Sequence, residues 1–211
     1  MRKGVELMLG RDHIISNVCS GVLLVEGLFA VNTCYTGVYA KEVHNVTKHM
    51  IADLVHPCNL NPWLILAISV SLFLLGTLLP DIDSNTSMLG RWIHIPVEHR
   101  TWTHTIWICA LLFLPCIWQK IFIWLFLGYV LHLFWDSFSR AGVCWFYPIS
   151  QYRSYGNAKV KRLHILKLYR TGNISEFVIV AMLIVVTVLV TVLCYKNNII
   201  QQAALIIKAS L

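Results

Sequence analysis

Histidine and aspartate residues gather at four points of the chain. They are His13, then Asp81 and Asp83, then His99 and His104, and finally His132 and Asp136. Imidazole nitrogens and carboxylate oxygens in one mixed set are typical ligands of zinc, manganese or iron. Seven candidate ligands exceed the four that one tetrahedral ion needs. The set therefore predicts a site for one to three divalent ions, zinc as first choice and manganese or iron as alternatives.

Two of these points have a spacing that favours metal binding. His132 and Asp136 are four residues apart, so on a helix they share one face, and Gly128 one turn earlier leaves room beside them. Asp81 and Asp83 follow Pro80, and two carboxylates so close repel each other unless a cation lies between them. The alternatives are a buried hydrogen-bonded pair for the first point and a solvated helix end for the second.

A cationic side chain accompanies the third point. Arg100 lies between His99 and His104, and a guanidinium suits a phosphate or a carboxylate. We expect Arg100 to bind the substrate anion, and Thr103 to cap the helix that follows. The alternative is a belt of polar and aromatic residues at the membrane interface.

The elements that carry these residues are membrane helices. The chain is 57% hydrophobic and only 13% charged, about half the charged share of a soluble protein. Apolar runs long enough for helices cover 14–35, 63–79, 105–118, 121–138 and 177–195. We expect an all-α, polytopic helical bundle with about five transmembrane helices. We expect the first helix to stay uncleaved, because its apolar run is longer than the apolar stretch of a signal peptide.

The charge distribution predicts the orientation. The N-terminus and residues 80–104 and 139–175 together hold twelve basic residues, whereas the opposite side holds five. The positive-inside rule places the first set, and with it the N-terminus, in the cytoplasm of a multi-pass plasma-membrane protein. All four points then face the cytoplasm. The spans and the orientation were predicted from hydropathy and charge without reference to these histidine and aspartate residues. Their placement on one side of the membrane therefore supports a common site.

We predict one membrane domain over 1–211. Within it, 10–150 form the helical core with the metal site, 151–175 a basic cytoplasmic loop, and 176–211 an anchor helix and tail. Glu26 lies too far along the first helix to share an ion with His13, and its role stays open.

The motifs resemble a known family. Leu-Leu-Pro-Asp-Ile-Asp at 78–83, Ser-Met-Leu-Gly at 87–90, His-Arg-x-x-Thr-His at 99–104 and Gly-Tyr-x-x-His-x-x-x-Asp at 128–136 have its order and spacing. So do Ala-Gly-Val at 141–143 and Pro148. The chain is similar, over about 10–150, to the YdjM-like family of LexA-regulated inner-membrane metal-dependent hydrolases, whose early histidine His13 matches. One departure is Ser84, where members often carry a histidine.

The resemblance implies a metal-dependent hydrolase, and its motif layout looks similar to zinc-dependent phospholipase C. We expect Asp81, Asp83, His99 and His132 to be catalytic and His13, Asp81, Asp83, His99, His104, His132 and Asp136 to bind the metal. A site at headgroup level favours a phospholipid or another phosphoester as substrate, with a carboxylester or amide as alternatives.

Non-enzymatic functions are the alternatives to hydrolysis. One is a structural or sensory metal site, and another is a metal transporter, although only Glu26 lies deep in the bilayer. A third is a cationic adaptor that uses residues 139–175. We expect membrane lipid as a partner and no nucleic acid; the oligomeric state stays open.

Overall fold

The computed structural model describes most of the chain. The described residues are 2–36, 39–55, 60–85, 87–93, 100–149, 151–154, 157–160, 162–163, 165–170 and 173–197. The candidate ligand His99 lies outside them. The elements in chain order are α1 (Arg2–Cys34), α2 (Ala40–Val55), α3 (Pro62–Leu78), η1 (Leu79–Asp83), η2 (Trp102–His104), α4 (Ile106–Trp118), η3 (Lys120–Phe122), α5 (Ile123–Phe138), β1 (Gln151–Ser154), β2 (Asn157–Val160) and α6 (Ile174–Lys196).

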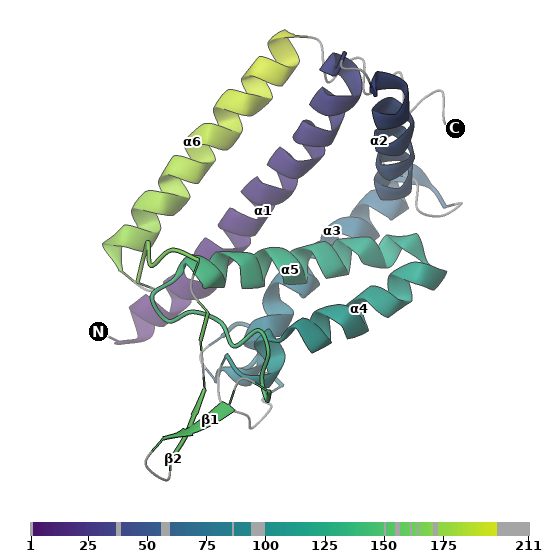
Figure 1. The fold of residues 1–211 in the computed structure, drawn as a ribbon. Helices are drawn as coiled ribbons and strands as arrows, with labels where there is room; N and C mark the ends of the chain where they lie inside the picture. The colour runs from purple at the N-terminus through teal and green to yellow at the C-terminus, as the bar shows by residue number, and fades with distance from the viewer. Residues whose placement is uncertain are drawn as a thin grey trace.

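The all-α membrane bundle predicted from the sequence is confirmed (Figure 1). Among the described residues, four helical segments are long and apolar enough to cross a bilayer: 11–34, 62–83, 120–138 and 174–196. The fifth expected span, α4, has only 13 residues. At 1.5 Å per residue it covers about 20 Å, less than the roughly 30 Å of hydrocarbon. It forms a helical hairpin with α5.

Residues 36–62 contain no long apolar run and are therefore expected to form a loop between two spans, but they contain a helix that the sequence did not predict. α2 mixes polar and apolar residues, so it has no continuous apolar run that hydropathy would detect. It is held against α1, because Ile51 and Leu54 are buried and the Thr47 hydroxyl donates to Asn32 over 2.8 Å. The expectation of a loop here was wrong, because packing on α1 stabilises the helix.

Helices α3 and α5 approach each other closely through two glycines. A Cβ on Gly76 would lie 2.1 Å from the carbonyl oxygen of Leu125, and a Cβ on Gly128 would lie 2.3 Å from that of Phe73. With a larger residue at either position, the backbones of α3 and α5 could not approach each other this closely. The side-chain amide of Asn17 joins α1 to this pair, donating to the Thr77 hydroxyl and the Gly128 carbonyl, both over 3.2 Å.

Helix α6 packs along α1, where the deep Glu26 finds a partner. The Thr191 hydroxyl donates to Glu26 Oε1 over 2.7 Å, and Glu26 is buried. A hydrogen bond between polar side chains stabilises helix pairs in a membrane by about 1 kcal/mol. The carboxyl group therefore links these two helices, far along α1 from His13.

The segments between the spans fold over one end of the bundle. In Figure 1 the start of α1 and the β1–β2 hairpin lie toward the bottom, while the ends of α1 and α6 lie at the top. Arg140 N donates to the Tyr169 carbonyl over 2.8 Å, and Val143 pairs with Leu163. The basic segment after α5 thus packs back onto the end that carries η1 and η2.

Candidate metal centre

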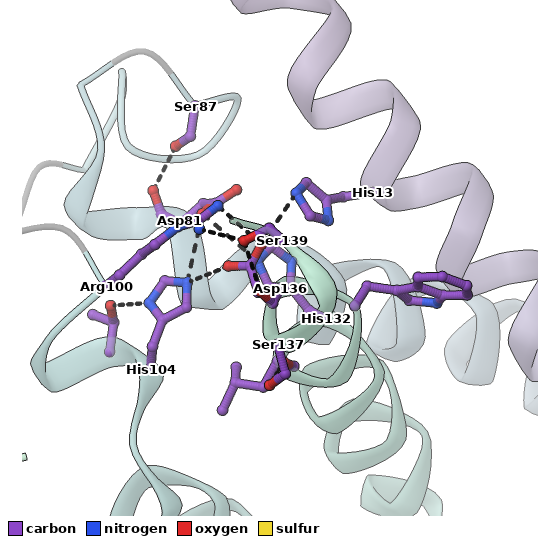
Figure 2. A network of polar contacts seen from close by, with 12 residues as sticks. His13, Asp81, Ser87, Arg100, His104, His132, Asp136, Ser137 and Ser139 are labelled. Carbon is purple, nitrogen blue, oxygen red and sulfur yellow. Dashed lines mark hydrogen bonds and ion pairs between the residues drawn. The ribbon is translucent and has the colours of Figure 1, made fainter. Parts of the chain in front are cut away.

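Four side-chain atoms from three segments converge at this end of the bundle (Figure 2). The Nε2 atom of His104 lies 3.2 Å from Oδ2 of Asp136 and 3.8 Å from Oδ1 of Asp81. The Nε2 atom of His132 lies 3.7 Å from the same Asp136 oxygen and 3.6 Å from the same Asp81 oxygen. We call these four residues the ligand cluster.

The distances within the ligand cluster are close to those between ligands of a tetrahedral ion, and its Asp81, His104 and His132 atoms all lie within 4.8 Å of one another. Ligand atoms about 2.0–2.2 Å from zinc in tetrahedral geometry lie about 3.3–3.6 Å from one another. The four distances above fall around that range. Within the described part of the chain, His132 Nε2 and Asp136 Oδ2 are buried and make no hydrogen bond. Buried polar atoms of this kind call for a partner, and a cation supplies one for both.

His13 lies against the ligand cluster from the side of α1. Its Nε2 atom is 3.6 Å from Asp136 Oδ1, and its ring stacks on that of His132 with centroids 4.5 Å apart. His13, His132 and Asp136 form a second set of ligand atoms within 4.8 Å of one another. The two Asp136 oxygens thus face both sets, and this carboxylate could bridge two ions.

The second nitrogen of His132 fixes the ring. Its Nδ1 atom lies 2.7 Å from the carbonyl oxygen of Thr77, which can only accept, so Nδ1 carries the proton. Nε2 is then left with its lone pair, the arrangement found in histidine ligands of metals. Because only one nitrogen is free to ligate, His132 can serve one ion and not two.

A hydroxyl performs the same role for His104. The Thr103 hydroxyl donates to Asp83 Oδ2 over 2.5 Å and lies 2.9 Å from His104 Nδ1. Its proton is used on the carboxylate, so its oxygen accepts from Nδ1–H and Nε2 faces the cluster. Burial lowers the pKa of His104 below its ordinary value, although Asp136 opposes the shift. The neutral form that can bind a metal is favoured.

Asp83 therefore lies outside the ligand cluster, behind His104. Its Oδ2 atom also accepts from the backbone N–H of Arg100 over 3.2 Å. Arg100 has a φ of 65°, a left-handed backbone conformation that is uncommon for residues other than glycine. The structure thus places Asp83 as a carboxylate that orients a histidine, whereas the sequence predicted a direct ligand.

The guanidinium of Arg100 is buried beside Asp136. It donates to Asp136 Oδ1 and to the Ser139 hydroxyl, each over 3.0 Å. The predicted role in binding a substrate anion stays a prediction. What the geometry gives is a cation that holds one candidate ligand carboxylate in place, because paired buried charges with hydrogen bonds are far less costly than single ones.

Asp81 is the part of the ligand cluster nearest to the outside. Its side chain is 20% exposed, whereas those of His104, His132 and Asp136 are 1% or less. The Ser87 hydroxyl donates to the Asp81 carbonyl over 2.7 Å and accepts from the Gly90 N–H over 2.8 Å. The turn after η1 thus supports the most exposed of the four residues of the ligand cluster.

Of the seven predicted metal ligands, the structure brings together His13, Asp81, His104, His132 and Asp136. Asp83 stands one hydrogen bond away, and His99 lies outside the described residues. Sequence reasoning missed Thr77, Ser139 and Asn17, and gave Thr103 only a capping role. Asn17 had a signal, since it follows His13 by four residues and so shares its helix face. The role of the Thr77 backbone carbonyl has no signal in the sequence, because it does not depend on the side chain.

Comparison with known proteins gives one family. The model of the family described as YdjM inner membrane protein matches residues 39–200. The match includes α6, which the motif resemblance had left out, and begins after His13. No curated protein and no solved structure matches the chain.

Proposed function

Since this chain belongs to the YdjM inner membrane protein family, we propose that it is a membrane-bound metal-dependent hydrolase acting on a phosphoester in a phospholipid-like substrate. The observation that carries the proposal is the ligand cluster. Its Asp81, His104 and His132 atoms form a three-ligand set with one partly exposed carboxylate, Asp81, so that a fourth position is left for water or substrate. Catalytic zinc sites keep a position open to water or substrate, whereas structural sites are closed.

Zinc is the ion that the donor set favours, with manganese or iron as alternatives. When bound, such an ion lowers the pKa of a water molecule to about 7 and polarises a phosphoryl oxygen. Asp81, His104 and His132 would hold it and leave a position for water, and His13 with Asp136 would hold a second ion. The chain's own contribution is to orient these groups through Thr77, Thr103 and Arg100.

The substrate class follows from the depth of the site. η1 ends the candidate span 62–83 and η2 precedes α4, so in this proposal Asp81 lies at the level of the lipid headgroups. A headgroup phosphoester can reach this level without leaving the bilayer. The cytoplasmic orientation is part of the proposal, and it is supported by the excess of basic residues on the side that holds the cluster.

Hydrolysis by purified protein tests the proposal. Detergent-solubilised wild type with added zinc or manganese should release phosphate or alcohol from bis-p-nitrophenyl phosphate or from short-chain phospholipids. Asp81→Asn and His132→Ala should lose that activity. His49→Ala, at an exposed position on α2, should keep it. Activity that survives in both cluster variants would eliminate the proposed function.

A further inference from the structure

An apolar cavity lies directly beside the metal centre. Its volume is about 310 Å³, at the lower end of the range of about 300–1,000 Å³ for ligand pockets. The residues that line it come from α4, α5, η1 and η2. They are Leu79, Ile82, Trp102, Ile108, Leu112 and Tyr129, together with Thr103.

The two hydroxyl groups at this cavity are already engaged in hydrogen bonds. The Tyr129 hydroxyl donates to the carbonyl of Thr103, and the Thr103 hydroxyl donates to Asp83. The Trp102 indole is turned into an edge contact with Tyr147. Water inside would find few partners, and a cavity of this kind favours hydrocarbon over water.

The cavity and the ligand cluster share a wall. Leu79 and Ile82 are three residues apart on η1, and residues at this spacing in a 3-10 helix lie on the same side. Asp81 lies between them in sequence and turns toward His104 and His132. A molecule with its chain against Leu79 and Ile82 would have its head beside the exposed edge of Asp81.

We propose that this cavity binds one acyl chain of a glycerophospholipid whose phosphoester lies at Asp81. The inference rests on the proposed function and gives it a specificity element, with Ile108 and Leu112 of α4 forming the wall that limits the chain. It also assigns a role to the short helix α4. Its 13 residues are fewer than those of the other candidate spans, and they close one side of a lipid-binding cavity.

A second apolar hollow on the protein serves as the control for ordinary contact with bilayer lipid. It is lined entirely by α6, by Phe177, Val178, Ala181, Met182, Val185 and Val186, and its volume is about 370 Å³. It has a similar size and apolar character. None of these residues lies on the segments that carry the ligand cluster. Lipid should touch this hollow without being selected there.

Photolabelling in phosphatidylcholine nanodiscs tests the inference. The probe is a phosphatidylglycerol with a diazirine at the end of one acyl chain, and labelled residues are located by peptide mass spectrometry. We expect labelling around Ile108 and Leu112 to saturate and to be displaced by unlabelled phosphatidylglycerol. Labelling around Val185 should rise in proportion to the probe. Ile108→Trp should reduce the first about tenfold, and Val185→Trp should reduce only the second.

The outcomes separate this inference from the proposed function. Retained metal in Ile108→Trp shows that the variant is folded, so a lost label then reports a filled cavity. Linear, non-displaceable labelling at both places would overturn the inference, even in a protein that hydrolyses phosphoesters. Saturable labelling in a protein that hydrolyses no lipid would refute the proposed function and leave the cavity as a lipid-binding site.

Discussion

The Nε2 atom of His104 lies 3.2 Å from Oδ2 of Asp136, although the two residues reach this point from different segments. His104 ends η2, before α4, and Asp136 lies in the last turn of α5. The α4–α5 hairpin brings these two segments back to the same end of the bundle. Arg100 donates to the other oxygen of the same Asp136 carboxylate. The α4–α5 hairpin and the loop before it therefore meet at this one carboxylate.

The Thr103 hydroxyl is expected to tune metal affinity without binding metal. Thr103→Val keeps the shape of the side chain but removes the link between Asp83 and His104. Loss of such an outer contact usually lowers metal affinity about 10–100-fold. Chelator competition on purified protein measures this change. Thr187→Val, which removes a hydroxyl bonded within α6, is the matched control. Equal affinity in the two variants would contradict the assigned role.

The close approach of α3 and α5 is expected to be necessary for the metal centre. Gly128→Ala places a methyl group 2.3 Å from a backbone oxygen of α3, and overpacking of this kind typically costs about 1–3 kcal/mol. His132 would move away from the Thr77 carbonyl, so both thermal stability and metal content should fall. Gly27→Ala is the control, because its Cβ meets nothing within 4 Å. A stable, metal-loaded Gly128→Ala protein would show that the packing is not needed.

The role of Arg100 can be determined by measuring metal affinity and KM separately. If it holds Asp136 in place, Arg100→Gln should weaken metal binding about 10–100-fold, because an orienting partner of a ligand is lost. If it binds only the substrate, metal affinity should stay unchanged while KM rises. We expect the first result from the 3.0 Å contacts to Asp136 and Ser139. Chelator competition beside steady-state kinetics distinguishes the two.

The orientation in the membrane is expected to follow the charge distribution. In a cysteine-free background, Lys48→Cys on α2 should react with a membrane-impermeant maleimide in intact spheroplasts. Arg91→Cys, on the turn after η1, should react only after permeabilisation. Both positions are exposed, so access to the thiol is limited by the membrane alone. The reverse pattern of labelling would place the metal centre on the outer face.

Much of this architecture could be predicted because the membrane imposes strong rules. Long apolar runs identified α1, α3, α5 and α6, and alternation of the loops placed His13, Asp81, His104 and Asp136 at one end. α2 escaped notice, because its stability comes from contacts with α1 and not from its own hydropathy. The division between ligands and supporting residues could not be predicted either. Asp81 and Asp83 look alike in sequence, and only the path of η1 turns one toward the cluster and the other toward Thr103.

The central claim is that the ligand cluster of Asp81, His104, His132 and Asp136 binds divalent metal, and elemental mass spectrometry of the purified protein tests it most directly. Wild type, purified in detergent and dialysed against trace zinc and manganese, should hold at least one ion per chain. His132→Ala and Asp136→Asn should lose it, and His49→Ala should retain it. Wild type without bound metal after this treatment, or equal metal in all four proteins, would contradict the account.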